Sequence, residues 1–409
     1  MKKYYILFCY SETVGGGQNY QNSKVKWLNE NGWCPIIFTA SRNYSFFKCK
    51  NNKIPWVELN KYSRLKSIYL SMPPEHWPKR KVEKELNRMV AVIPKSAEPI
   101  IIESHTDYWS EWGELLAQRL DAKNFCYLLD ELLEQSVTKE FLYFKFLRRE
   151  VAGIDRSSMH RLFAGYQDVP VGNDYVLTAA NYGSVVDFDS DIVSDVKRCD
   201  YNIAYMGRHK QYMENILDGV IKFCYNSANK TVNFIILGEL NDSLLRKYEQ
   251  PKNLIVTKLG FITPIPKIFF SKIDVLIAGA GCALLSAREG IPVIVADAGT
   301  MLANGILGYT TRSILFSEAN KKTFDEALKD VLVDKIHEQM EFSLPEDRDA
   351  GEAYKEHFMF IEKSEKKLEY FNFIEKPQRK YRPLYGYMLI IRFNIINILK
   401  KIWNYFKKK

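Results

Sequence analysis

The stretch "IDVLIAGAGCALLSAREGIPVIVAD" (residues 273–297) places two apolar runs around a turn of small residues and a helical segment. Each run is short and continuous, which is typical of a parallel strand that is buried on both faces. Gly279 ends the first run, and glycine suits a tight turn at the carboxyl end of a strand. The stretch therefore predicts a strand, a turn, a helix and a second strand of one parallel sheet.

The same alternation of apolar runs and helical segments continues along the chain. Helical segments such as 20–31 and 109–120 are amphipathic. The other predicted strands are 4–10, 34–40, 99–104 and 124–130 in the first half, and 201–207, 232–238 and 253–260 in the second half. Because 409 residues fit about two domains of roughly 150 to 200 residues, we predict an α/β fold with two Rossmann-like, doubly wound domains that face a cleft.

Changes in composition predict where the chain divides. The stretch 185–198 is acidic and weakly periodic, and a polar break follows the predicted helix 324–340. The predicted parts are a first domain at 1–185, a second domain at 198–350, a helix within 351–378 that crosses back to the first domain, and a basic amphipathic tail at 379–409.

The excess of positive charge lies in this tail. The chain has 58 basic and 49 acidic residues, and nine basic residues but no acidic ones fall within 379–409. Removing those nine leaves 49 basic residues, equal to the number of acidic ones, so the body is neutral and nucleic-acid binding is not indicated.

The sequence pattern of the tail predicts a helix with one polar stripe. Its apolar run is interrupted by Arg392, Asn394 and Asn397, which disfavours a membrane-spanning helix. We predict an in-plane helix at an anionic membrane leaflet, where each basic residue near the surface adds about 1 kcal/mol. A helix packed on the protein or on another subunit is the alternative. The basic and aromatic stretch "EHWPKRK" (75–81) could touch an anionic acceptor or a membrane, or be a solvated loop.

The cysteines and the N-terminus suggest a protein of the cytoplasm. Seven cysteines are scattered with no C-x-x-C spacing, so neither a disulfide framework nor a zinc site is predicted. The first apolar run, 4–10, is too short for a signal sequence or a spanning helix. The "DFDSD" stretch (187–191) lacks the glycine and terminal glutamate of a calcium loop.

Three consecutive glycines, Gly15, Gly16 and Gly17, follow the first predicted strand. Without Cβ atoms the backbone can approach a ligand closely, and the start of the following helix favours phosphate. The spacing is neither G-x-G-x-x-G nor a nucleoside-triphosphate loop. A flexible turn without a ligand is the alternative.

The order of these parts resembles the GT-B glycosyltransferases, particularly the family 4 type, over about residues 4–375. The segments that carry the resemblance are "SETVGGGQNYQNSKVKWLNENGW" (11–33), "IIIESHTDYWSEWGELLAQRL" (100–120), "YMGRHKQYMENILDGVIKF" (205–223), "NLIVTKLGFI" (253–262) and the stretch quoted first. The family usually carries two glutamates eight positions apart in that last stretch. Here Ile277 and Leu285 stand at those positions, and only Glu289 is acidic.

The resemblance implies catalytic residues in the first domain. It places His105 in the cleft beside the glycine turn, where an imidazole could accept the proton of an acceptor hydroxyl and Asp107 could orient it. A histidine that only hydrogen-bonds a loop is the alternative.

The resemblance also implies a donor site in the second domain. Arg208 and Lys210 would supply positive charge to a diphosphate leaving group, or be a solvated pair at a helix start. The backbone of the 279–281 turn would hold the diphosphate. A tight turn that binds no ligand is the alternative. The predicted donor-binding residues are Gly15, Gly16, Gly17, Arg208, Lys210, Gly260, Phe261, Ile262, Gly279, Ala280, Gly281 and Glu289. For Phe261, core packing is the alternative.

The implied function is a glycosyltransferase of the hexosyltransferase type, with retention of anomeric configuration. It would move a sugar from a nucleotide diphosphate sugar to a lipid-linked or glycan acceptor, as in bacterial capsule or O-antigen synthesis. No metal or other cofactor is expected, and the protein would be peripheral on the inner face of the cytoplasmic membrane. A nucleotide-sugar epimerase and a non-catalytic GT-B-like scaffold are the alternatives, the second because of Leu285.

Overall fold

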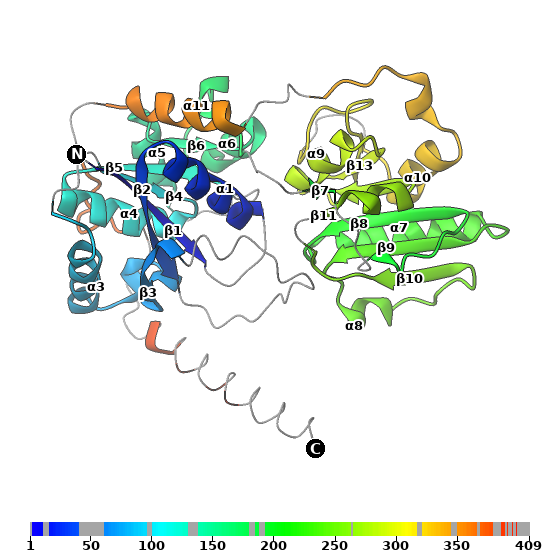
Figure 1. Cartoon of the computed structure of the whole chain (residues 1–409), viewed down its shortest axis with the longest axis horizontal. Coiled ribbons are helices and arrows are strands. Elements are labelled where there is room, and N and C mark those ends of the chain that lie inside the picture. The colour runs from blue at the N-terminus through cyan, green and yellow to red at the C-terminus, as the bar shows by residue number, and fades with distance from the viewer. Residues whose placement is uncertain are drawn as a thin grey trace.

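A computed structural model gives the structure of the chain. It describes residues 2–10, 16–40, 61–95, 100–129, 138–179, 185–187, 193–262, 265–316, 321–344, 350–365, 369–378 and 386–388, together with 391, 395 and 398. Two α/β domains lie side by side (Figure 1). Each is built around a six-stranded sheet, and a two-stranded sheet joins β7 (Val185–Val186) to β11 (Ile265–Pro266).

The first sheet is parallel throughout and has the order β3-β2-β1-β4-β5-β6. Its strands are β1 (Lys3–Tyr10), β2 (Trp33–Ala40), β3 (Ser63–Ser67), β4 (Ile100–Ser104), β5 (Lys123–Leu128) and β6 (Val151–Gly153). The helices of this domain are α1 (Gly16–Glu30), α3 (Lys79–Ala91), α4 (Asp107–Leu120), α5 (Lys139–Leu147) and α6 (Arg156–Phe163).

Both faces of β1 are covered, which explains why its sequence is apolar from Tyr5 to Cys9. Tyr5 and Leu7 pack in one cluster with residues of α1, whereas Ile6 and Phe8 pack in another with the tryptophans of α4. Alternate side chains of a strand point to opposite faces, so a strand between two helical layers needs apolar residues on both.

The second sheet has the order β10-β9-β8-β12-β13-β14, with β14 as an antiparallel edge. Its strands are β8 (Tyr201–Gly207), β9 (Val232–Gly238), β10 (Leu254–Lys258), β12 (Val275–Ala278), β13 (Val293–Ala296) and β14 (Ala303–Ile306). Its helices are α7 (Met213–Asn226), α8 (Asp242–Leu245), α9 (Ala280–Arg288) and α10 (Phe324–Leu332). Helices α7 and α10 pack on one face of this sheet, and α9 packs on the other.

The chain returns to the first domain at its end. Helix α11 (Ala350–Glu362) packs with Tyr354 and Ile361 against the cluster that contains Tyr5 and α1 (Figure 1). Phe371 then packs against Phe141 of α5. Helix α11 and Phe371 therefore contribute to the core of the first domain.

Every strand predicted from an apolar run is present, and the predicted two-domain fold is confirmed. Strands β3, β6 and β14 were not predicted, because each is short or contains polar residues and glycine at a sheet edge. The predicted helix 324–340 is shorter: α10 ends at Leu332, and Lys335 takes a left-handed backbone with φ 50° before a short 3-10 turn (Ile336–Gln339). The stretch 75–81 is not only a loop, since α3 begins at Lys79.

Candidate nucleotide-diphosphate site between the domains

The site begins where β12 runs into α9. Gly279 is extended, and Ala280 takes a left-handed backbone with φ 54°, which is uncommon for a residue with a Cβ. The Ala280 N–H donates to the Ile314 carbonyl at 2.7 Å, and this bond holds the turn. No side chain caps the start of α9. The N–H groups of its first turn have no partner within the helix, so this end favours an anion.

Two basic residues lie beside this turn. Arg208 and Lys210 follow β8, and β8 is hydrogen-bonded to β12, so the carboxyl ends of both strands lie together. Burial raises the pKa of the Cys282 thiol in the first turn of α9, and the charges of Lys210 and Arg208 oppose that rise. The parallel pairing of β8 with β12 therefore puts Arg208 and Lys210 at the same edge of the sheet as the start of α9.

Two tyrosines that sequence reasoning missed form the base of this site. The Tyr205 hydroxyl donates to the Arg208 carbonyl at 2.5 Å and shares a hydrogen bond with Tyr212. The Tyr212 hydroxyl lies 3.6 Å from the position that a Cβ of Gly279 would take. Burial raises the pKa of Tyr212 to about 12, so both hydroxyls keep their protons near neutral pH. A tyrosine inside an apolar strand gives no sequence signal of such a role.

Asp297 fixes the neighbouring loop after β13. Its buried carboxylate accepts the N–H groups of Gly299 and Thr300 at 2.9 and 2.8 Å and pairs with Lys321 at 3.1 Å. The carboxylate is thereby committed to holding the turn that follows the strand. Sequence reasoning did not identify this residue, although it directly follows β13 and ends the stretch 273–297.

The two domains touch beside the 279–281 turn. Ile154, which follows β6, packs with Ala280 against a small apolar cluster of Ala298, Leu315 and Phe316. In the same place Arg161 of α6 lies over the Phe316 ring, with 4.5 Å between its Cζ and the ring centroid. The start of α9 therefore lies at the contact between the domains.

His105 lies in a buried network in the first domain, away from solvent. It is 3% exposed; its Nδ1 is 2.5 Å from Gln21 Nε2 and its Nε2 is 2.7 Å from Glu103 Oε1. The structure thus corrects the expected orienting partner. Glu103, at the end of β4, holds the ring, whereas the Asp107 carboxylate accepts the N–H of Tyr108 at the start of α4. Both ring nitrogens of His105 are already engaged.

Glu103 is the centre of that network. Its carboxylate accepts hydrogen bonds from Tyr5, from Tyr20 at 2.8 Å and from Lys24, in addition to His105. Burial by itself would raise the pKa of Glu103, but the charge of Lys24 and the bond from His105 hold it well below its usual value. Glutamate in the apolar run of β4 was not singled out from the sequence, because a strand pattern does not reveal which polar side chain is buried.

The remaining predicted residues are placed as follows. Gly16 and Gly17 are the first residues of α1, and Gly15 lies outside the described residues. Gly260 follows β10 with φ 73°; Phe261 is half-buried, and Ile262 packs in the core with Ala283 of α9. Glu289 ends α9, roughly 13 Å from the turn at a rise of 1.5 Å per residue. The structure does not bring Glu289 to the site.

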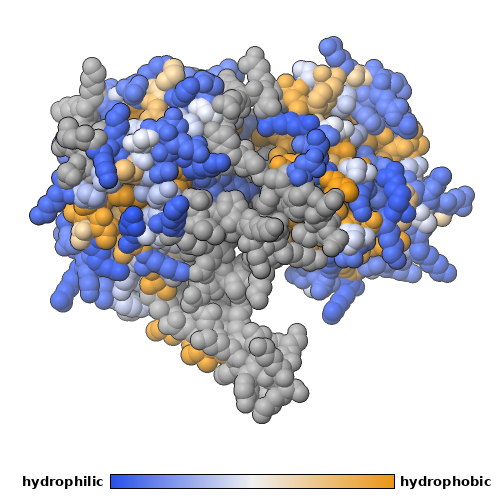
Figure 2. All heavy atoms as spheres, viewed as in Figure 1, coloured by the Kyte–Doolittle hydropathy of each residue, from blue (hydrophilic) through white to orange (hydrophobic). Residues whose placement is uncertain are grey.

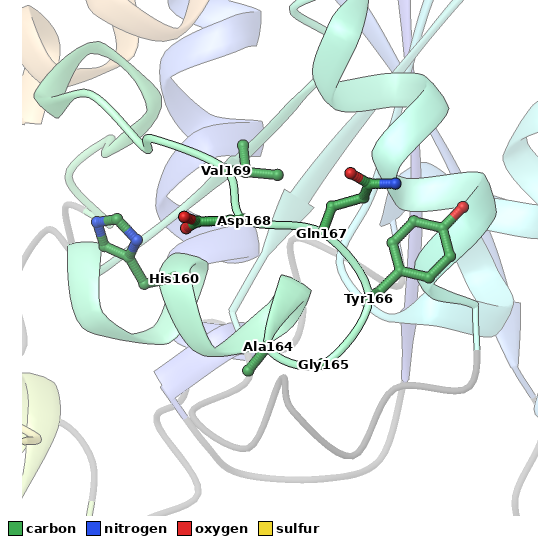
Figure 3. Close-up of a pocket in the computed structure, with 7 residues that line it drawn as sticks. All are labelled: His160, Ala164, Gly165, Tyr166, Gln167, Asp168 and Val169. Carbon is green, nitrogen blue, oxygen red and sulfur yellow. The ribbon is translucent and has the colours of Figure 1, made fainter.

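A separate hollow of about 430 Å³ lies at the end of α6 (Figure 3). It is lined by His160 and by residues 164–169, all from one short stretch of the first domain. None of the predicted site residues lines it. Across the described ranges of the chain, no three His, Cys, Asp or Glu side chains are grouped so that they could hold a metal ion.

Known structures share this architecture. No protein-family model matches the sequence, and no curated protein matches it. A glycosyltransferase from Rickettsia africae has a TM-score of 0.56 at 13% identity, over 88% of this chain and 99% of that chain. The MnaA protein of S. aureus, solved with UDP, has a TM-score of 0.51 at 15% identity, over 90% of this chain and 100% of that chain.

A candidate UDP-N-acetylglucosamine 2-epimerase from Listeria monocytogenes has a TM-score of 0.52 at 12% identity, over 88% of this chain and 97% of that chain. These similarities extend over nearly the whole of each protein, at identities that establish only the fold. The chain therefore has the GT-B fold, with two Rossmann-like domains.

Proposed function

We propose that this protein is a glycosyltransferase that moves a sugar from a nucleotide diphosphate sugar to an acceptor held at the inner face of the cytoplasmic membrane. The acceptor would be lipid-linked or another glycan of bacterial surface polysaccharide, such as capsule or O-antigen. One observation carries the proposal: the pairing of β8 with β12 puts Arg208 and Lys210 at the same sheet edge as the uncapped start of α9, and that start lies at the contact between the domains.

The geometry suits the chemistry of a diphosphate leaving group. In the transfer, the bond between the sugar and the diphosphate breaks, the acceptor oxygen bonds to the sugar, and negative charge grows on the departing phosphate. The N–H groups of Gly281 and Cys282 and the two cations would stabilise that charge without a metal ion. Arginine adds a planar fork of donors, and lysine adds a point charge.

The first experiment is isothermal titration of the protein with a panel of nucleoside diphosphates. We expect one of them to bind, and we expect R208A to weaken that binding by roughly tenfold or more, because a hydrogen bond to a charged group contributes about 1.5–3 kcal/mol. R246A is the matched control, since Arg246 is an exposed arginine of the same domain at the end of α8. Absence of binding to every nucleotide would end the enzyme proposal and favour the scaffold.

A nucleotide-sugar epimerase is the second candidate, because a candidate epimerase shares this fold over 88% of the chain. Product analysis separates the two reactions. An epimerase converts the sugar of the donor without an acceptor, whereas a transferase releases nucleoside diphosphate only when membrane acceptor is added. A catalytic role of His105, retention of configuration and the hexosyl group stay predictions of this proposal.

A further inference from the structure

The C-terminal helical residues lie on the first domain at Trp77. Gly386 sits so close that a Cβ there would be 2.7 Å from the His76 carbonyl oxygen and 2.7 Å from Trp77 Cζ3. The rings of Tyr387 and Trp77 meet edge to face, 6.1 Å apart. Trp77 is itself buried, and its indole N–H donates to the Tyr69 carbonyl at 3.0 Å. Two segments about 300 residues apart in the chain are thus in close contact.

Beyond this contact the helix presents an apolar stripe, which we define as Met388, Ile391, Ile395 and Ile398. All four are helical, and they are 65%, 58%, 52% and 57% exposed. At 3.6 residues per turn they fall within an arc of about 80°, so they form one narrow face. Figure 2 shows apolar side chains at the surface below the first domain, where this stripe projects. An exposed row of apolar side chains such as this one marks a site of interaction with another molecule or a membrane.

Two basic side chains of α3 lie close in the chain to this contact. Lys79 and Arg80 are exposed at the start of α3, two and three residues after Trp77. The sequence 379–409, which contains the stripe, carries nine basic residues and no acidic one. Lys79 and Arg80 therefore follow within three residues of Trp77, the side chain that contacts the segment at which the stripe begins.

The charge decides between two occupants of this face. The stripe spacing of three and four residues also suits a coiled coil with a second copy. However, a second copy would bring the same nine positive charges and no acid to pair with them. An anionic lipid surface supplies both the negative charge and an apolar layer for the isoleucines. Among the helices of the described residues, none is long and apolar enough to cross a membrane.

We propose that the stripe and the start of α3 form one docking surface for an anionic membrane, with the helix lying in the plane of the interface. The contact between Gly386 and Trp77 then holds the first domain at the bilayer. This inference does not depend on the proposed transfer reaction, because neither a donor nor an acceptor takes part in it.

The test is flotation of the full-length protein with vesicles of phosphatidylcholine, with and without phosphatidylglycerol. We expect the protein to bind only to the anionic vesicles, and we expect this binding to weaken as the salt concentration rises. The double variant I391D/I395D should lower the partition coefficient by at least about tenfold, since burial of each isoleucine is lost. Ile374, which is 81% exposed in the 369–378 segment, supplies the control I374D, which should bind as the wild type does.

A second pair of variants tests whether the start of α3 contributes to the docking surface together with the stripe. K79E/R80E should lower the partition coefficient by roughly tenfold or more, because each basic residue near the surface adds about 1 kcal/mol. K252E, an exposed site on the second domain, should have no effect. Equal binding to neutral vesicles, or no effect of either double variant, would overturn the proposal. A dimer in sedimentation that I391D/I395D dissociates, without vesicle binding, would instead identify a second copy as the occupant.

Discussion

Arg161 lies over the ring of Phe316, with 4.5 Å between its Cζ and the ring centroid, and this contact joins the first domain to the second. Its Nη1 is also 2.8 Å from the position that a Cβ of Gly299 would take, so the guanidinium lies close over this glycine. Gly299 follows Asp297 in the loop that borders the proposed diphosphate site. The stacking of one arginine thus fixes how the α6 side of the first domain meets that loop.

Loss of this arginine is expected to loosen the domains. A cation–π contact contributes about 0.5–2 kcal/mol, so R161A should shift the population toward a more open arrangement by roughly 2- to 30-fold. Small-angle X-ray scattering should then show a larger radius of gyration. R156A, at the exposed first residue of the same helix, should leave the scattering curve unchanged. Identical curves for R161A and the wild type would contradict the expectation.

A substitution at Gly281 should weaken ligand binding without lowering the stability of the fold. Nothing lies within 4 Å of the position that its Cβ would take, and it is the second residue of α9. We expect G281A to unfold at the same temperature as the wild type or slightly higher, because alanine favours a helix. The methyl group would occupy the space in front of the α9 amides, so titration should show weaker nucleoside-diphosphate binding. A variant with wild-type affinity would remove the start of α9 from the proposed site.

The rate at which the Cys282 thiol is alkylated should show whether a diphosphate is bound at the same turn. Burial raises the pKa of its thiol despite Lys210 and Arg208, so alkylation should be slow at neutral pH and faster at alkaline pH. A bound diphosphate beside the two cations should slow it further. Peptide mass spectrometry after N-ethylmaleimide treatment measures this rate, and Cys199, partly exposed just before β8, serves as the internal control. Equal protection of both cysteines would indicate a general change rather than a local ligand.

His357 makes stability depend on pH. It lies on α11 in the buried network with Tyr20 and Lys24, and its Nε2 is 3.0 Å from the Thr178 carbonyl. Burial first, and then the charge of Lys24, lowers its pKa from 6.5 to about 3. Between these values the unfolded chain binds a proton that the folded protein does not, so stability falls as pH falls below 6.5, by up to about 1.4 kcal/mol per unit.

Urea unfolding at neutral pH and at pH values between 6.5 and 3 measures that slope. The variant H357Q removes the titrating group, so its stability should change less over this range than that of the wild type. H160Q, at an exposed histidine of α6, should keep the wild-type slope. A slope unchanged in H357Q would assign the pH dependence to other groups, of which the paired Glu103 is the first to examine.

The sequence by itself determined the elements of the fold. Runs such as 4–10 and 201–207 are apolar at nearly every position because their strands are buried on both faces, and this burial is a local property that the pattern reports. The same holds for the turn at 279–281, because the glycines and the following helix are adjacent in the chain. Edge strands such as β14 escaped prediction, because one exposed edge removes the need for an apolar run.

The tertiary structure alone decided which of these elements meet. Arg208 reaches the start of α9 because β8 pairs with β12, and strand order depends on contacts between residues far apart in the chain. His105 is held by Glu103 rather than Asp107, because the network is completed by Lys24 and Tyr20 from another helix. Hydrophobic periodicity predicts which residues are buried, but not which residues they contact. It therefore could not predict the contact of Arg161 with Phe316 or that of Gly386 with Trp77.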